Sequence, residues 1–450
     1  MATLLIKNAD QLVTMDPERR EIEKGGLFAR NGVIESIGNV TELPETADEV
    51  LDLKGCVVIP GLINTHHHFY QNLTRTVPAA QNAKLFNWLR ILYPIWARMG
   101  PDHIRISAKI ALVEMALAGT TCSSDHLYMF PNGARLDDEI EAAEQIGMRI
   151  HATRGAMSIG ESEGGLPPDS LVEKEDEILE DCLRLIQHYH DPNPGAMIRI
   201  AVAPCSPFSV SQELMRDTAL LARDQGVMLH THLAENEEDI AYSLRKFGCR
   251  PGEYAENLGW VGNDVWHAHC VHLNSSELSL FARTGTGVTH CPCSNMRLGS
   301  GIAPVREMLN HGINVGLGVD GSASNDSGDL MGEARQALLL QRVIHGGDAV
   351  SARDALEIAT LGGAKVLGRD DIGSLENGKR ADFAVFPLDS VALAGNWDPV
   401  AALVFCSPVQ ALHTVVDGRF IVRDGLLTNT DLPTLLNQHK NLTCGLIDGN

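Results

Sequence analysis

Residues 60–71, PGLINTHHHFYQ, mark the point where the pattern of this 450-residue sequence changes. An apolar run and a Pro-Gly pair lead into three consecutive histidines, His66, His67 and His68. Before this stretch the sequence is typical of short antiparallel strands, and after it strand-like and helix-like segments alternate. Three adjacent histidines fit a metal site, a buried polar patch or a chance feature of a surface loop, so the surrounding pattern has to decide.

The sequence that follows predicts an α/β barrel. Eight short β-rich segments alternate with segments whose apolar residues recur every three and four positions, such as 104–118 and 211–225. Eight strands alternating with helices over about 300 residues is the scale of a (β/α)₈ barrel, and a doubly wound open sheet is the alternative. The strand candidates are 56–64, 119–125, 148–154, 198–204, 227–232, 264–269, 286–290 and 313–320.

The sequence at both ends of the chain has a pattern different from that of the barrel region. LLIKNADQLVTM (4–15) and GGLFARNGVIESIG (25–38) near the start, and HTVVDGRFIVRDG (413–425) near the end, each suggest strand, tight turn and strand. We therefore expect the two ends to pair into one small β-sandwich that is discontinuous in sequence. The predicted regions are 1–58 for its N-terminal part, 59–370 for the metal-dependent barrel, and 371–450 for its C-terminal part and a tail.

Composition narrows the classes of function. Lys and Arg number 36 against 58 Asp and Glu, and the net charge of −22 disfavours binding to nucleic acid or to an anionic membrane. No apolar run reaches the length of about 18 residues that spans a bilayer, and the N-terminus lacks the features of a secretory signal. The ten cysteines form no paired framework, which favours free thiols in a reducing cytoplasm; Cys291 and Cys293 are interpreted as packing residues.

Polar residues gather where the predicted strands end, which is where a barrel of this kind places its chemistry. Because alternate residues of a strand point the same way, His66 and His68 can share one target while His67 points to the other side. Several imidazoles with one carboxylate and an open position for water form a catalytic metal site, for which zinc is favoured and ferrous iron or manganese also fits. The strand-end residues are His66, His68, His230, His232, His267, His269, His290 and Asp320.

Glu235 lies three residues beyond His232 in the stretch HTHLAE. If the chain turns after the strand, this carboxylate stands beside the metal without binding it, as a proton shuttle does. The acidic run that follows also fits a plain solvated glutamate at a helix N-terminus. The histidine cluster favours the proton shuttle.

Five motifs in order, PGLINTHHH, HTHLAE, HAHCVH, HCPCSNMRLGSG and GLGVDGSASND, resemble those of the amidohydrolase superfamily, in particular its aminohydrolase branch of deaminases and triazine hydrolases. The resemblance covers nearly the whole chain. It implies that one divalent ion is bound, since 198–209 offers no lysine of the kind that bridges two ions in related barrels. It also leaves His67 and His230 as off-face neighbours with a structural role. The implied ligands are His66, His68, His232 and Asp320.

The resemblance further implies a hydrolytic deamination in which water activated by the metal adds to an amino-bearing ring carbon. Asp320 would accept the proton of the water, Glu235 would protonate the adjacent ring nitrogen, and His269 would polarise the water or the developing oxyanion. Ammonia would leave. A catalytically inactive barrel used as a binding protein is the alternative from another class, disfavoured because the whole set of ligands is present.

Four further stretches, NTHHHFYQNLTR, DHLYMFP, TRGAMSIGESEGGLPP and APCSPFS, more closely resemble the 8-oxoguanine deaminases. Cys205 stands where guanine deaminases have an arginine, which argues against ordinary guanine. Guanine, a pterin such as isoxanthopterin and a hydroxyatrazine-type triazine remain as alternatives. Relatives suggest a homodimer, and Asn295 is interpreted as support for the loop after the seventh strand. Candidate substrate contacts are Gln71, His126, Tyr128, Arg154, Cys205 and His290.

Overall fold

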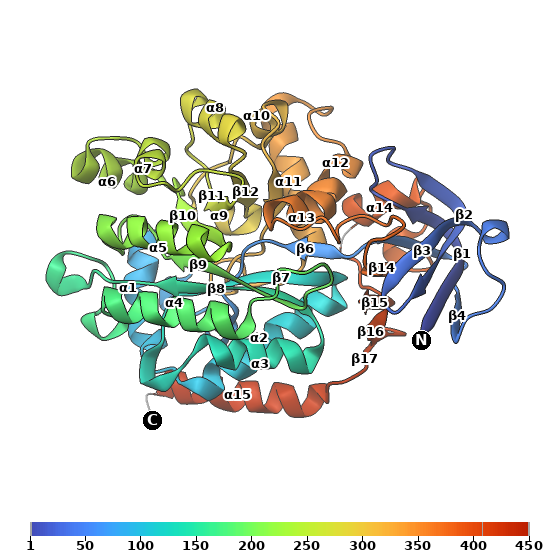
Figure 1. The fold of residues 1–450 in the computed structure, drawn as a ribbon, viewed down its shortest axis with the longest axis horizontal. Helices are drawn as coiled ribbons and strands as arrows, with labels where there is room; N and C mark the ends of the chain where they lie inside the picture. The colour runs from blue at the N-terminus through green and yellow to red at the C-terminus, as the bar shows by residue number, and fades with distance from the viewer. Residues whose placement is uncertain (1, 407, 449–450) are drawn as a thin grey trace.

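Eight parallel strands close into a barrel at the centre of the molecule, which a computed structural model describes for residues 2–406 and 408–448 (Figure 1). The strands follow the barrel wall in chain order, and the last strand pairs with the first. A closed ring of strands confirms the predicted (β/α)₈ barrel and excludes the open sheet. The strands are β6 (Leu62–Asn64), β7 (Thr120–Leu127), β8 (Arg149–Ala156), β9 (Ile198–Pro204), β10 (Met228–Leu233), β11 (Val265–His269), β12 (Gly287–His290) and β13 (Val315–Leu317).

Helices cover the outside of the barrel, and the two helices expected from periodicity are among them, α2 (Pro101–Leu117) and α5 (Gln212–Gln225). The side chain of Ser211 caps the start of α5, and Gly226, with a φ of 69°, ends it. The other α-helices are α1 (Leu85–Trp96), α3 (Leu136–Ile146), α4 (Glu175–Tyr189), α6 (Glu237–Phe247), α7 (Pro251–Asn257), α8 (Ser275–Thr284), α9 (Pro292–Leu298), α10 (Val305–Asn310), α11 (Leu330–His345), α12 (Ala352–Glu357), α13 (Gly363–Val366), α14 (Pro399–Phe405) and α15 (Leu432–Asp448).

Strands from both ends of the chain form a second, mixed sheet beside the barrel, as predicted (Figure 1). Its order is β17-β16-β15-β14-β5-β1-β2-β3, and β4 pairs with β1. Alternate residues of β5 serve two cores: Val58 packs inside the small domain, whereas Val57 and Ile59 join the core of the barrel. The strands are β1 (Thr3–Val13), β2 (Glu21–Arg30), β3 (Val33–Asn39), β4 (Glu49–Asp52), β5 (Cys56–Pro60), β14 (Phe383–Pro387), β15 (His413–Val416), β16 (Arg419–Arg423) and β17 (Leu426–Leu427).

The predicted strand 56–64 is in fact two strands that belong to different sheets, β5 and β6. Gly61 separates them, and its N–H donates to the carbonyl oxygen of Asp382 at 3.0 Å. A Cβ at this position would lie 2.0 Å from Oγ1 of Thr121, so no other residue fits without displacing the neighbouring strand. The unbroken apolar run in the sequence hides this crossing. The exact limits of the three predicted regions stay a prediction.

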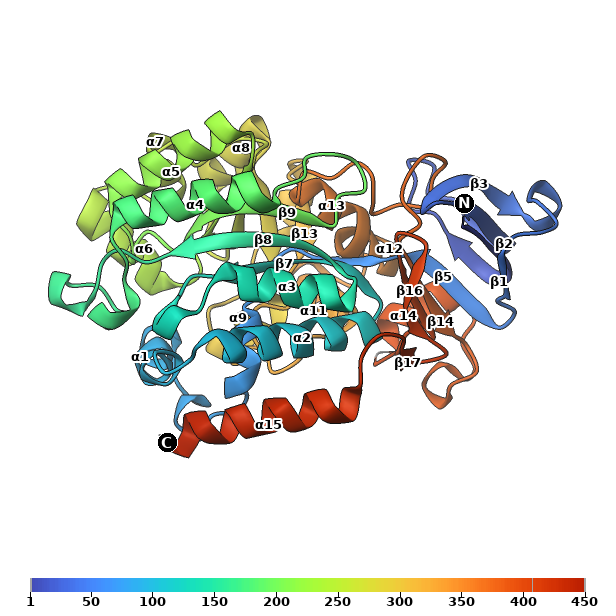
Figure 2. The ribbon, with the colours of Figure 1, turned by 60° about the horizontal axis from the view of Figure 1, so that its bottom comes forward.

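The C-terminal helix α15 runs back along α2 on the outside of the barrel (Figure 2). His439 of this helix shares a hydrogen bond of 2.7 Å with Oδ1 of Asn72, and Asn72 donates to the carbonyl of Ser107. Asn72 lies in η2 (Phe69–Thr74), the short turn that directly follows the histidine triplet. The end of the chain therefore braces the segment that carries the first strand of the barrel into the site.

Ile63, Cys122, Ala201 and Trp266, from four strands of the barrel, form one buried apolar cluster. In the described part of the chain all ten cysteines are free thiols, as expected. Among the described residues, no helix has both the length and the apolar character needed to cross a bilayer.

Candidate metal centre and active site

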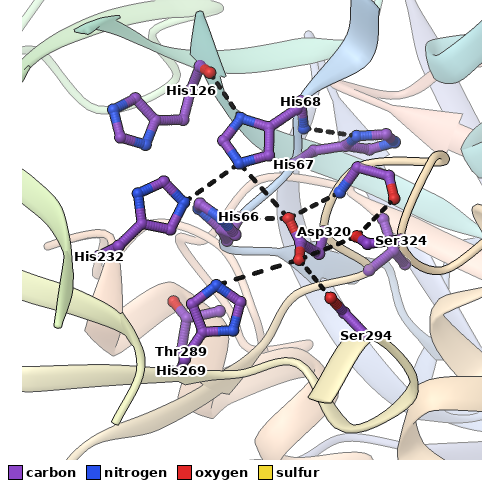
Figure 3. A network of polar contacts seen from close by, with 12 residues as sticks. His66, His67, His68, His126, His232, His269, Thr289, Ser294, Asp320 and Ser324 are labelled. Carbon is purple, nitrogen blue, oxygen red and sulfur yellow. Dashed lines mark hydrogen bonds and ion pairs between the residues drawn. The ribbon is translucent and has the colours of Figure 1, made fainter. Parts of the chain in front are cut away.

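Three imidazoles and one carboxylate meet at the carboxyl end of the barrel (Figure 3). His66 and His68 follow β6, His232 lies in β10, and Asp320 follows β13. Nε2 of His68 is 3.2 Å from Nε2 of His232 and 3.4 Å from Oδ1 of Asp320. Nε2 of His66 is also 3.4 Å from that oxygen. The ring nitrogens of His66, His68 and His232 lie within 4.8 Å of one another, and the carboxylate of Asp320 meets those of His66 and His68, so the four residues expected as ligands lie together.

Hydrogen bonds on the far side of each ring decide which nitrogen faces that point. Nδ1 of His68 lies 2.7 Å from the carbonyl oxygen of His126, and Nδ1 of His232 lies 2.6 Å from that of Cys205. Since a carbonyl only accepts, each Nδ1 carries the proton and each Nε2 keeps a lone pair. Burial also lowers the pKa of His232 to about 3, so its ring is neutral.

Asp320 is held by donors on both carboxylate oxygens. Ser294 donates to Oδ2 at 2.6 Å, Ser324 donates to the same oxygen at 3.2 Å, and the N–H of Gly321 donates to Oδ1 at 2.7 Å. Burial acts to raise the pKa of Asp320, but the neighbouring imidazoles of His269, His66 and His68 hold it well below its usual value. The carboxylate is therefore ionised and fixed in direction.

The donor set fits a divalent cation. Nε2 of His66 is buried and has no hydrogen-bond partner among the described residues, although it lies at the centre of the cluster. Neutral imidazole nitrogens with one carboxylate oxygen are the ligands that zinc and similar ions prefer at catalytic sites. This site can therefore hold a metal ion, and the unpaired nitrogen is explained by it.

Glu235 stands beside this cluster at the start of the loop after β10. Its side chain is buried, and its N–H donates to Oδ2 of Asp239 at 2.9 Å, which fixes the turn. Burial raises the pKa of Glu235 to about 7, so it gains and releases a proton near neutral pH. The surroundings favour the proton shuttle over the solvated glutamate.

His269 reaches the same space by an unusual backbone conformation. Nε2 of His269 lies 3.7 Å from Oε2 of Glu235 and 3.9 Å from Oδ2 of Asp320. Its φ is +71°, in the left-handed region, whereas His267 of the same strand faces the helices and bonds the carbonyl of Trp260. Burial lowers the pKa of His269, but the two carboxylates outweigh it and raise the pKa.

Left-handed backbone recurs around the site at non-glycine residues. Ala234, beside Glu235, has a φ of +51°, and Asp320 has a φ of +60°. Such conformations cost about 1–3 kcal/mol each and persist where the surrounding structure enforces them. They explain why strict strand parity does not place every side chain of this site.

A pocket opens beside the cluster. Gln71, Tyr128 and Cys205, three of the expected substrate contacts, line it together with Glu235 and His269. Burial raises the pKa of Cys205 to about 12, so the sulfur is a neutral thiol. The other walls come from residues without a chemical signature in the sequence, which our sequence reasoning missed: Leu85, Trp88, Leu89, Tyr93, Phe208 and Leu298.

The other three expected substrate contacts do not line this pocket. The Arg154 guanidinium bonds Glu173 and Asp181 and stacks on the ring of Phe130, so we correct its role to a structural one. His126 lies against His232, with ring centroids 4.9 Å apart, and its Nε2 bonds the carbonyl of Ala203. His290 is buried at the end of β12, and both its nitrogens lack partners within the described residues.

The remaining histidines and Asn295 support the site from behind. Nδ1 of His67 accepts a hydrogen bond from the N–H of His68 at 2.7 Å, and Asn295 holds Nδ1 of His269 at 2.9 Å through Oδ1. The prediction that His230 points away from the inner face of the barrel is wrong. His230 shares the inner face with His232, one layer deeper, and bonds His66. Identical strand parity of positions 230 and 232 was the signal for this.

Comparison with known proteins finds relatives that match this chain over most of its length. The 8-oxoguanine deaminase of Pseudomonas aeruginosa is 45% identical over 428 residues, which cover 94% of this chain and 95% of that protein. The hydroxydechloroatrazine ethylaminohydrolase of Pseudomonas sp. (strain ADP) is 37% identical, covering 96% of this chain and 93% of that protein. The crystal structure of atrazine chlorohydrolase from Arthrobacter aurescens complexed with zinc superposes with a TM-score of 0.92 at 35% identity, covering 98% of this chain and 100% of the other.

The sequence model of the amidohydrolase family matches residues 57–421, from β5 to β16. This match includes the histidine triplet, Glu235, His269 and Asp320, which the fold gathers at one end of the barrel. On the sequence match and on these relatives, the chain belongs to the amidohydrolase family.

Proposed function

We propose that this protein is a metal-dependent aminohydrolase that deaminates an amino-substituted purine-like ring, with 8-oxoguanine as its substrate and urate and ammonia as products. The observation that carries the proposal is the buried Glu235, whose pKa near 7 equips it to move a proton at the wall of the pocket. The relative that is 45% identical, an 8-oxoguanine deaminase, supports the choice of substrate.

His66, His68, His232 and Asp320 would hold one divalent cation. Zinc is our first choice because three of the four donors are imidazole nitrogens, and ferrous iron and manganese are the alternatives. The zinc in the Arthrobacter aurescens structure supports this choice. When bound, the cation supplies the Lewis acidity that makes water a nucleophile near neutral pH.

The protein's own groups handle the protons. Asp320, ionised because its pKa is held low, accepts the proton of the attacking water. Glu235 delivers a proton to the ring nitrogen next to the amino-bearing carbon, which makes that carbon a better electrophile. His269, 3.7 Å from Glu235 and 3.9 Å from Asp320, donates from Nε2 to the oxygen that is added. Asp320 then passes its proton to the amino group, which leaves as ammonia, while the added hydroxyl returns a proton to Glu235 and becomes the ring carbonyl.

We expect the polar edge of the substrate ring to contact the side chains of Gln71, Tyr128 and Cys205. Oε1 of Gln71 is buried without a hydrogen-bond partner in the described structure, so a ring N–H would satisfy it. The apolar side chains of Trp88, Leu89 and Phe208 suit the faces of a flat heterocycle. A homodimeric assembly and a cytoplasmic location stay predictions from the sequence.

The test is a comparison of steady-state rates of ammonia release from 8-oxoguanine, guanine, isoxanthopterin and hydroxyatrazine. We expect kcat/KM for 8-oxoguanine to exceed the others by at least about tenfold, a difference of roughly 1.4 kcal/mol. Rapid turnover of one of the other three with none of 8-oxoguanine would leave the reaction type standing and overturn the substrate. No turnover of any of them, with no metal bound, would favour an inactive binding protein.

A further inference from the structure

The three imidazoles of the metal centre are not oriented in the same way. Nδ1 of His68 and Nδ1 of His232 each bond a backbone carbonyl. Nδ1 of His66 instead lies 2.8 Å from Nε2 of another imidazole, that of His230. Of these three rings, only that of His66 takes its orientation from a side chain, which a substitution can remove.

The carbonyl group of Trp266 fixes the direction of the hydrogen bond between His230 and His66. Nδ1 of His230 lies 3.0 Å from the carbonyl oxygen of Trp266, which can only accept, so this Nδ1 carries a proton. In a neutral ring Nε2 then has the lone pair and accepts from Nδ1–H of His66. His66 is left with its lone pair on Nε2, the atom 3.4 Å from Asp320.

The protein holds His230 rigidly in this position. Its ring stacks on the indole of Trp266, with centroids 4.5 Å apart and planes inclined by 17°. The indole N–H of Trp266 in turn donates to the carbonyl of Thr65 at 3.1 Å, next to His66 in the chain. One tryptophan of β11 thus ties His230 of β10 to the strand end that carries His66.

His230 is fully buried and does not line the pocket, so it has no route to the substrate. We propose that His230 is a positioning residue that fixes the tautomer and the rotation of His66, so that Nε2 of His66 faces the metal. The inference rests on the metal centre proposed above. Partners of this kind change metal affinity by about 10–100-fold when they are removed.

The experiment measures zinc affinity by chelator competition and the visible spectrum of the cobalt(II) form for three variants. His230→Phe keeps a ring against Trp266 but offers no acceptor to His66. His230→Asn can still bond the carbonyl of Trp266 but is too short to reach His66, whereas the longer side chain in His230→Gln places an amide oxygen near the lost Nε2. We expect the first two to bind zinc about 10–100-fold more weakly with an altered cobalt spectrum, and His230→Gln to regain about tenfold or more.

His267→Phe is the matched control, because His267 is an equally buried histidine that bonds the carbonyl of Trp260 away from the site. Its zinc affinity should equal that of the parent. Parental affinity and spectrum in His230→Phe, or an equal loss in all four variants, would overturn the inference. If His230→Phe fails to fold, equal affinity of His230→Asn and His230→Gln overturns it instead. A parent protein that binds zinc but deaminates none of the bases refutes the proposed function and leaves this result intact.

Discussion

Glu235 and Glu238 are identical residues three positions apart, and their surroundings give them different chemistry. Glu235 is 4% exposed, with a pKa raised to about 7, whereas Glu238 is exposed to solvent. A carboxyl group that is half protonated at neutral pH can both receive and deliver a proton, which an ordinary surface glutamate does poorly. The sequence favours the proton shuttle over a solvated glutamate for Glu235, and its burial supports that role.

Replacing Glu235 with glutamine should remove the proton donor and leave the shape of the pocket. We expect kcat for deamination to fall by about 10²–10⁴-fold, the usual contribution of general acid–base catalysis. Metal content, measured on the same samples, should not change, since Glu235 is outside the proposed ligand set. Glu238→Gln on the exposed face is the matched control and should keep full activity. Parental activity in Glu235→Gln would refute its assignment.

The pH dependence of kcat should report the same group. Glu235 acts as an acid, so the protonated form is the active one, and kcat should decline as the pH rises through about 7. The raised pKa places this decline above the range in which an exposed glutamate titrates, because burial disfavours the charged form. A pH profile from 5.5 to 9 tests it. The same decline in the residual activity of Glu235→Gln would assign it to another group.

At the scale of elements, periodicity carried the prediction of the fold. The alternation of strand-like and helix-like segments predicted the barrel, and strand parity predicted that His66 and His68 converge. Strand parity could not predict the direction of every side chain. Nothing in the sequence HAH indicates that His269 has a left-handed φ and turns inward while His267 faces the helices. Arg154 was misassigned because its carboxylate partners come from a distant helix and loop.

The walls of the pocket were the least predictable part. They come from α1, from the loop after β9 and from the end of α9, and apolar side chains there have no spacing that distinguishes a substrate wall from ordinary core. Phe208 illustrates this, since it is 9% exposed and packs against Phe86 with ring centroids 5.1 Å apart. Only the closed barrel shows that Phe208 faces the site and Phe86 does not.

Replacing Phe208 with alanine should therefore weaken substrate binding more than it slows the chemical step. Loss of an apolar contact worth about 1.5–3 kcal/mol predicts a rise in KM of about tenfold or more, with a smaller change in kcat. Phe86→Ala, which removes the neighbouring ring outside the pocket, is the control and should leave KM near its parental value. Steady-state kinetics with the best base of the panel measure both. An equal effect of the two variants would indicate packing rather than contact.

At the scale of the whole molecule, a buried ion cluster joins the barrel to the second sheet. Arg149 begins β8, and its guanidinium donates to both oxygens of Asp382 at 2.6 and 3.0 Å and to Asp417 at 3.0 Å. The side chain of Arg149 is fully buried, and that of Asp382 is 2% exposed. Because neither charge is solvated, each depends on the other, and the two domains are coupled through them.

Arg149→Met should accordingly destabilise the protein by about 3–5 kcal/mol, because it leaves a buried carboxylate without its partner. Adding Asp382→Asn should recover part of the loss, since an amide carries no net charge. The exposed pair Arg30 and Glu35 supplies the control, and Arg30→Met should cost no more than about 1 kcal/mol. Denaturant unfolding measures these differences. A loss in Arg149→Met no larger than in Arg30→Met would contradict the coupling.

The proposed metal centre spans the seam at which the last barrel strand, β13, pairs with the first, β6. These two strands share a single paired position, Leu317 with Asn64, and the N–H of Asp320 donates to the carbonyl of His66 across the same seam. A chain emerging from the ribosome therefore has no complete site until residue 320 has been made and the ring has closed. An ion bound by residues of both edges would stabilise the closed ring at its shortest strand pairing by the free energy of metal binding.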